Sequence, residues 1–250
     1  MGKGIQKYAI EGLKVDKSIK SKHSGIWIFG LILTTSYMFV QWIALFLAPI
    51  NIIAPLEGIG LIVLVLFSYY VLHEDIYKIQ IIGIILIIVG ISFITIFNHN
   101  VGEISIDDLS LPLLLTFSLS AIVCEVALIF ISKLKNYLAA GLIFGVTAGT
   151  FNAFQTVSKR ITAIPDPTIT LIYTFITFLT AALTLLITQL AFAKSKANIA
   201  IPCYTSTSIS FAVILSLIGL NEEIVLLQVF GIIIVIFGVI CVSAFNKEIK

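Results

Sequence analysis

The sequence predicts an all-α integral membrane protein with about eight transmembrane helices, and three observations lead to this prediction. Hydrophobic residues make up 59% of the 250 residues and charged residues only 11%, whereas a soluble domain carries about 25% charged residues. The apolar residues form runs as long as a bilayer-crossing helix requires, roughly 20 residues. Lysines gather at alternate connections between these runs, which is typical of multi-pass membrane proteins.

The apolar segments are separated by short connections that are polar or contain proline. In chain order the predicted spans cover residues 25–48, 51–72, 78–97, 112–133, 137–158, 169–192, 197–219 and 225–245. Ala48-Pro49 divides the first two, and the runs His-Glu-Asp at 73–75 and Asn-Glu-Glu at 221–223 divide later ones. Since no connection is long enough for a soluble domain, almost the whole chain is expected in the membrane.

The positions of lysine and arginine predict the orientation. With an even number of spans both termini lie on one side, and that side would carry all 15 basic residues except Lys159 and Arg160. The positive-inside rule therefore predicts a multi-pass protein of the cell membrane with both termini of this chain in the cytoplasm. The basic segment 1–24 and the tail 246–250 would lie there, and the loop 98–111 on the opposite side.

The chain contains an internal repeat. Asn-Ile-Ile-Ala-Pro at 51–55 returns as Asn-Ile-Ala-Ile-Pro at 198–202, and His-Glu-Asp-Ile at 73–76 as Asn-Glu-Glu-Ile at 221–224. At an offset of 148 residues three further positions match, Gln80 with Gln228, Gly83 with Gly231 and Gly90 with Gly238. We assign the first repeat to 25–97 and the second to 112–245. Equivalent spans are an odd number of helices apart, so they run in opposite directions, as in the inverted repeats of many secondary transporters.

The residues of the first repeat resemble a known family. Ala-Pro-Leu at 54–56, His-Glu-Asp at 73–75, Gly83 and Gly90 look like the repeat of the drug/metabolite transporter (DMT, EamA-like) superfamily. The stretch from Ile-Thr-Gln at 187–189 through Ile-Pro-Cys-Tyr at 201–204 to Asn-Glu at 221–222 is similar to its NIPA-type magnesium transporter branch. The resemblance implies an inverted-repeat transporter bundle of nine or ten helices that moves a small solute or ion by alternating access.

Two features depart from this resemblance. Pro-Leu-Glu-Gly-Ile at 55–59 stands where the branch usually has Pro-Leu-Gly-Ala-Leu, so this chain has an additional carboxylate, Glu57. The second repeat has five predicted spans and the first only three. Because Gly-Ile-Gln-Lys at 4–7 looks like the trailing end of a helix, we expect a further helix before the span 25–48.

Glu57 and Glu125 are the acidic residues predicted to lie well inside spans. A charged side chain at the centre of a spanning helix costs roughly 2.5–3.5 kcal/mol on insertion scales, and such residues commonly mark functional sites. We interpret both as substrate-binding candidates, with Glu57 also the candidate ligand of a metal ion or a coupling proton. The structural alternative for each is a protonated carboxyl group bonded to a neighbouring helix.

Polar side chains also recur at helical spacing on several spans and predict a hydrated cavity. The candidate substrate-binding residues are Glu57, Gln41, Tyr37, Thr184, Thr188, Tyr204, Ser208 and Glu125. The alternative for the hydroxyl groups is that they bond the carbonyls of their own helix. Asn152 and Gln155 fit either interpretation. Gly141, Gly145 and Gly149 predict a close helix-packing surface or a homodimer contact.

The function predicted from these features is a secondary transporter or facilitator for a small solute or cation, Mg²⁺ included. A drug or metabolite exporter of the same superfamily is the nearest alternative, and a non-transporting membrane scaffold is an alternative of another class. An enzyme is not expected, because the sequence has no His-Glu-x-x-His motif or comparable catalytic set. The net charge of +2 does not suggest nucleic acid as a partner, the lipid bilayer is the expected environment, and no cofactor is predicted.

Overall fold

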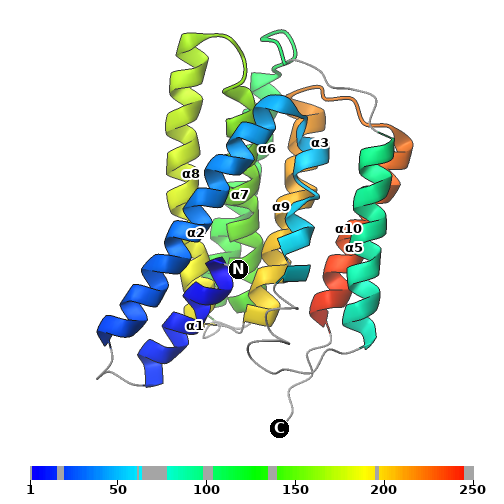
Figure 1. The fold of residues 1–250 in the computed structure, drawn as a ribbon. Coiled ribbons are helices and arrows are strands. Elements are labelled where there is room, and N and C mark those ends of the chain that lie inside the picture. The colour runs from blue at the N-terminus through cyan, green and yellow to red at the C-terminus, as the bar shows by residue number, and fades with distance from the viewer. Residues whose placement is uncertain are drawn as a thin grey trace.

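A computed structural model describes residues 2–15, 20–60, 62–63, 78–97, 104–134, 140–194 and 197–244. Within these residues the chain forms α-helices and connecting turns, without a strand, so the all-α prediction is confirmed. The helices, shown in Figure 1, are α1 (Gly2–Val15), α2 (Lys20–Leu47), α3 (Ile50–Ile53), α5 (Lys78–Ile96), α6 (Leu111–Leu134), α7 (Ala140–Ile161), α8 (Pro167–Lys194), α9 (Ala197–Gly219) and α10 (Leu226–Ala244).

Three of the described helical segments are long and apolar enough to span a membrane: His23–Leu47 in α2, Leu111–Leu134 and Pro167–Lys194. Shorter apolar helical stretches lie at Ile50–Gly60, Ile81–Ile94, Cys203–Gly219 and Leu226–Cys241. Large apolar side chains cover the outside of these helices; Leu171, for example, is 74% exposed. Since such a surface is unfavourable in water, these helices mark a membrane protein.

Helix α7 is the central element of the bundle and packs against both α8 and α9. Nearly all its side chains from Phe144 to Ile161 are buried. A methyl group added at Gly145 would lie 2.8 Å from the carbonyl oxygen of Ala200, and one added at Gly149 would lie 2.5 Å from that of Tyr204. The glycines at these two positions thus allow α7 and α9 to touch backbone to backbone, as the Gly-xxx-Gly pattern predicts.

Helices α5 and α10 form a second close pair and run in opposite directions (Figure 1). A methyl group at Gly90 would lie 2.7 Å from the carbonyl oxygen of Gly231, and one at Gly238 would lie 2.8 Å from that of Gly83. Gly83 and Gly90 correspond to Gly231 and Gly238 in the sequence repeat. The contacts therefore pair the repeat positions crosswise, which is the arrangement that a twofold rotation between the two helices produces.

The first residues differ from the basic segment expected at 1–24. Residues 2–15 form α1, which packs against α2, and the N-terminus lies in the middle of the bundle (Figure 1). Gln6 is 1% exposed and Ala9 is fully buried, while the backbone at Gly2 lies close to that at Gly30. Positions 2, 6 and 9 share one helix face, and the sequence interpretation overlooked this face because it weighed only the lysines. Residues 4–7, interpreted as the trailing end of a helix, lie near the start of α1, which continues to Val15.

The end of α7 also differs from the prediction. The span predicted at 137–158 continues through Ile161, so Lys159 and Arg160 belong to the helix and not to a connection. They are 1% and 3% exposed. Both are buried because partners elsewhere in the bundle satisfy them: Lys159 donates to Gln41 of α2, and Arg160 pairs at 3.0 Å with Glu222, in the turn before α10.

Candidate functional site

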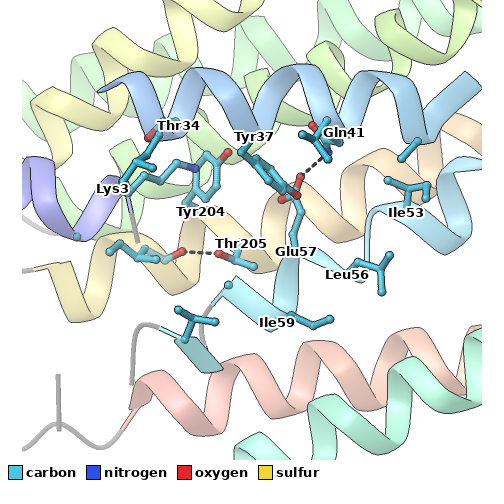
Figure 2. A pocket seen from close by; sticks show the side chains of 18 residues that line it. Lys3, Thr34, Tyr37, Gln41, Ile53, Leu56, Glu57, Ile59, Tyr204 and Thr205 are labelled. Carbon is cyan, nitrogen blue, oxygen red and sulfur yellow. Dashed lines mark hydrogen bonds between the residues drawn. The ribbon is translucent and has the colours of Figure 1, made fainter. Parts of the chain in front are cut away.

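The site begins at a break in the helix that opens with α3. Pro55 has no N–H to continue the helical bonding, and the chain turns at residues 54–56 before it resumes helical structure at Glu57. Across the break the backbone forms 3₁₀-type hydrogen bonds, in which each N–H donates to the carbonyl oxygen three residues earlier. The Glu57 N–H donates to Ala54 at 3.1 Å and the Gly58 N–H to Pro55 at 2.9 Å. The break directs the Glu57 side chain toward α2, as Figure 2 shows.

The Glu57 carboxylate accepts hydrogen bonds from three helices. The side-chain amides of Gln41 on α2 and Asn152 on α7 each donate to Oε1 at 3.0 Å. The Ser208 hydroxyl on α9 donates to Oε2 at 3.0 Å, and Asn152 also donates to Ser208 at 2.7 Å. These bonds give the buried carboxylate oxygens hydrogen-bond partners, so Glu57 links elements from both halves of the chain.

Lys159 joins this network through Gln41. Its ammonium group donates to Gln41 Oε1 at 2.8 Å, while the other end of the same amide donates to Glu57. The opposite orientation of the amide would place its NH2 against an ammonium and its oxygen against a carboxylate, so the two neighbours fix it. Lys159 and Gln41 are 1% and 4% exposed, which keeps this three-residue relay out of solvent.

A second ammonium group enters the site from α1. Lys3 Nζ lies 3.1 Å from the centroid of the Tyr204 ring, and Figure 2 shows the side chain reaching across from α1 between α2 and α9. Tyr204 itself is 7% exposed. Such a cation–π contact stabilises an ammonium group in a setting with little water.

Two adjacent cavities meet at these residues. The first, which we name the carboxylate cavity, has a volume of about 570 Å³ and is lined by Glu57 together with apolar residues of α2 and the broken helix. The second, the lysine cavity, has about 300 Å³ and lies between α1, α2, α7 and α8 around Lys159. The two share one wall, formed by Lys3, Thr34, Tyr37, Gln41 and Tyr204.

Most of the candidate residues from the sequence lie at these cavities. Tyr37, Gln41, Glu57, Tyr204 and Ser208 come together around the carboxylate. Thr184 and Thr188 line the lysine cavity.

Glu125 does not belong to this group. It lies on α6 and is 6% exposed, its neighbour is Thr150 of α7, and it lines neither cavity. The candidate role of Glu125 in substrate binding is therefore not supported by its position, because α7 stands between it and the site.

Sequence reasoning missed Lys3 and Lys159 and left Asn152 open. Lys3 was counted as a cytoplasmic residue and Lys159 as part of a connection, since a lysine usually marks the end of a span. A usable signal was the composition of α7, where Gly, Thr, Asn and Gln replace the aliphatic residues of the other helices. A helix of this composition faces protein and not lipid, which would have placed its polar side chains inside the bundle.

The surroundings of Glu57 do not fit a bound metal ion. Glu57 is the single carboxylate among the described residues that line the two cavities. Its oxygens face amide and hydroxyl donors, whereas Mg²⁺ prefers several oxygen ligands. In the part of the chain that the structure describes, no group of three or more His, Cys, Asp or Glu residues could hold a metal.

Comparison of the chain with protein-family models, curated proteins and solved structures finds no match. The function must therefore be argued from the geometry of the cavities and of the helices around them.

Proposed function

We propose that this protein is a secondary transporter or facilitator that moves a small polar solute across a membrane by alternating access. In this proposal about eight helices of the chain span the membrane as an inverted-repeat bundle. The observation that carries the proposal is the position of Glu57. It follows a helix break and lies between the halves of the chain, bonded to Gln41 of the first and to Asn152 and Ser208 of the second.

Discontinuous helices and a polar site between two repeats are the common design of secondary transporters. The crosswise contacts of α5 and α10 support the same design, because they relate one repeat to the other by a twofold rotation. Ionisable residues inside a membrane are costly and are retained mainly where they act on a solute or an ion. Lys159 and Glu57 meet this description, since both lie in helical segments next to a cavity.

One end of the bundle is closed by an ion pair, which supports an alternating-access cycle. Arg160 donates to Glu222 at 3.0 Å and to the carbonyl oxygen of Leu45 at 2.9 Å. Glu222 also accepts from the N–H of Ile50 at 3.0 Å. These bonds join the ends of α2 and α7, the start of α3 and the turn before α10. A transport cycle of the proposed kind would open this end after closing the other.

The charge of the site favours a polar organic solute over Mg²⁺. Two ammonium groups, those of Lys3 and Lys159, lie close to one carboxylate that already accepts three hydrogen bonds. By formal charge, a divalent cation entering the cavities would meet two cationic side chains and one carboxylate. A scaffold without transport would have no use for cavities of 570 and 300 Å³ lined by buried charged groups, so a scaffold remains the less favoured alternative.

Flux into proteoliposomes that contain the purified protein tests the proposal. We expect uptake or counterflow of at least one member of a panel of small metabolites, with loss of flux in Glu57→Gln. The matched control is Glu125→Gln, which removes a buried carboxylate outside the cavities and should keep its flux. Transport of Mg²⁺ with no metabolite transported would favour the magnesium alternative, and no flux of any panel member would favour the scaffold.

The orientation remains part of this proposal, with the C-terminal end of the chain in the cytoplasm, whereas the N-terminus lies in the middle of the bundle. Single cysteines at Asp107 and Lys133 would test it by labelling with a membrane-impermeant thiol reagent. We expect the first to react from outside the cell and the second from the cytoplasm. The reverse pattern would contradict the proposed topology.

A further inference from the structure

The lysine cavity is lined by polar groups that have no hydrogen-bond partner. Gln6 Nε2, Thr184 Oγ1 and Thr188 Oγ1 are buried and unbonded, and their residues are 1%, 7% and 5% exposed. All three residues line this cavity together with Lys159. A buried polar group without a partner is costly, so these groups are suited to a ligand that bonds them.

Two other threonines on the same face of α8 do have hydrogen-bond partners for their hydroxyl groups. The hydroxyl of Thr177 donates to the carbonyl oxygen of Tyr173 at 2.8 Å, and that of Thr180 donates to Ile176 at 2.8 Å. Thr184 and Thr188 make no such bond to their own helix. On α8, the buried hydroxyl groups without a partner therefore both border the lysine cavity.

The charged groups around the cavity supply donors but no available acceptor. The Lys159 ammonium has three N–H donors and bonds Gln41 Oε1. Lys3 places a second ammonium on the shared wall. The Glu57 carboxylate is already bonded to Gln41, Asn152 and Ser208. Counted by formal charge, Lys3, Lys159 and Glu57 sum to +1.

We propose that the transported solute is a small organic monoanion whose carboxylate group binds in the lysine cavity to Lys159, Thr184 and Thr188. This inference rests on the proposed transport function and specifies its substrate class. A carboxylate has only acceptors, about four lone-pair positions, and so complements a wall of donors. Its single negative charge cancels the excess of +1. The remainder of the solute would extend past Tyr37 and Gln41 into the larger, mostly apolar carboxylate cavity.

The volume of the lysine cavity, about 300 Å³, is at the lower end of ligand pockets in proteins. A phosphate monoester carries the same kind of acceptor oxygens, but its second charge would leave the site negative. A neutral amide of the same shape has one acceptor oxygen in place of two and carries no charge, and its NH2 group could not accept from the Lys159 ammonium. Charge and hydrogen bonding therefore both favour the carboxylate over these two relatives.

Binding to the purified full chain in lipid nanodiscs tests this inference. The probes are propionate, lactate and benzoate, each paired with its own amide, together with inorganic phosphate and MgCl2. Isothermal titration should detect the carboxylates and show the amides at least about tenfold weaker, the ratio expected for losing charge-assisted hydrogen bonds. Equal affinity for acids and amides would overturn the proposal, and so would tighter binding of phosphate or binding of Mg²⁺ alone.

The residues are tested with matched variants. Lys159→Met and the double variant Thr184→Val/Thr188→Val should each weaken carboxylate binding by about tenfold or more, whereas Lys159→Arg should retain part of it. Thr177→Val is the control, since its hydroxyl bonds its own helix. If Lys159→Met does not give monodisperse protein, the threonine variants decide. Unchanged binding in the double threonine variant would overturn the proposed site.

Flux measurements separate this inference from the function on which it rests. Carboxylate binding that depends on these residues, without flux in proteoliposomes, would retain the site and refute transport. Flux of a neutral or cationic solute with no carboxylate binding would retain transport and refute the anion proposal.

Discussion

The ammonium group of Lys159 and the carboxylate of Glu57 are connected through a single side chain, because the amide of Gln41 accepts from one at 2.8 Å and donates to the other at 3.0 Å. The three residues lie on α7, α2 and the segment after α3. Opposite charges are thus held near each other without direct contact. The ammonium keeps free N–H donors toward the lysine cavity, and this is the arrangement on which the proposed anion binding depends.

Replacing Glu57 by glutamine should abolish or uncouple transport while the protein stays folded. The amide keeps the shape of the carboxylate, but its NH2 group must face either the two amide donors or the Ser208 hydroxyl, whose own proton then loses its acceptor. We expect a loss of about 1–3 kcal/mol in the free energy of unfolding, measured by thermal unfolding in detergent. Normal transport in Glu57→Gln would show that the residue is structural.

A double-mutant cycle should reveal coupling between Lys159 and Gln41. Lys159→Met leaves the Gln41 oxygen without its donor, and Gln41→Leu leaves the ammonium without its acceptor, each at about 1–3 kcal/mol. The double variant should lose clearly less than the sum, because the interaction is lost only once. Thr116→Val on the exposed face of α6 provides the control partner and should combine additively with Lys159→Met. Additive losses in the Lys159–Gln41 pair would contradict the relay.

Gly90→Ala should destabilise the protein by about 1–3 kcal/mol, the usual cost of overpacking. Its methyl group would lie 2.7 Å from the carbonyl oxygen of Gly231, and a backbone atom cannot move aside as a side chain can. Gly25→Ala is the matched control on α2, since nothing lies within 4 Å of the added methyl group. Thermal unfolding of both variants compares them directly. Equal stabilities would show that α5 and α10 are not in backbone contact.

Arg160→Met should cost about 3–5 kcal/mol near neutral pH, because it leaves Glu222 buried without its counter-charge. Burial raises the pKa of Glu222 above its usual value, and Arg160 works against this rise. A raised pKa in the folded state contributes stability that is present below the unfolded pKa, about 4.3, and is lost as the pH rises through the folded pKa. Removing Arg160 raises this pKa further.

The penalty of Arg160→Met should therefore be smaller at pH 5 than at pH 7.5, because a raised pKa favours protonation of Glu222 as the pH falls. Denaturation of the variant and the parent protein at both pH values measures this difference. A penalty that is the same at the two values would show that Glu222 does not carry the missing charge.

The helix positions could be predicted because a membrane-spanning helix is recognised from the apolar residues of its own segment, without knowledge of its neighbours. The span predicted at 112–133 is Leu111–Leu134, and that at 197–219 is Ala197–Gly219. The site was partly predictable for a related reason: Glu57 and Gln41 are polar residues within apolar runs. Lys159 was missed because its partner, Gln41, is 118 residues away. A lysine that a distant amide satisfies looks in sequence like a lysine at the water interface.

The backbone contact between α5 and α10 has a consequence for how such a protein could move. Because these helices touch backbone to backbone, with no layer of side chains between them that could slide, we expect the pair to move as one rigid unit. Gly58, the neighbour of Glu57, rests on it, since a methyl group there would lie 3.2 Å from Ile87 and 3.4 Å from Val235. Lys159 belongs to α7, which is not part of that unit. Any rocking of α7 against this unit must therefore strain two links to Glu57, the bridge from Lys159 through Gln41 and the direct bond from Asn152 of α7.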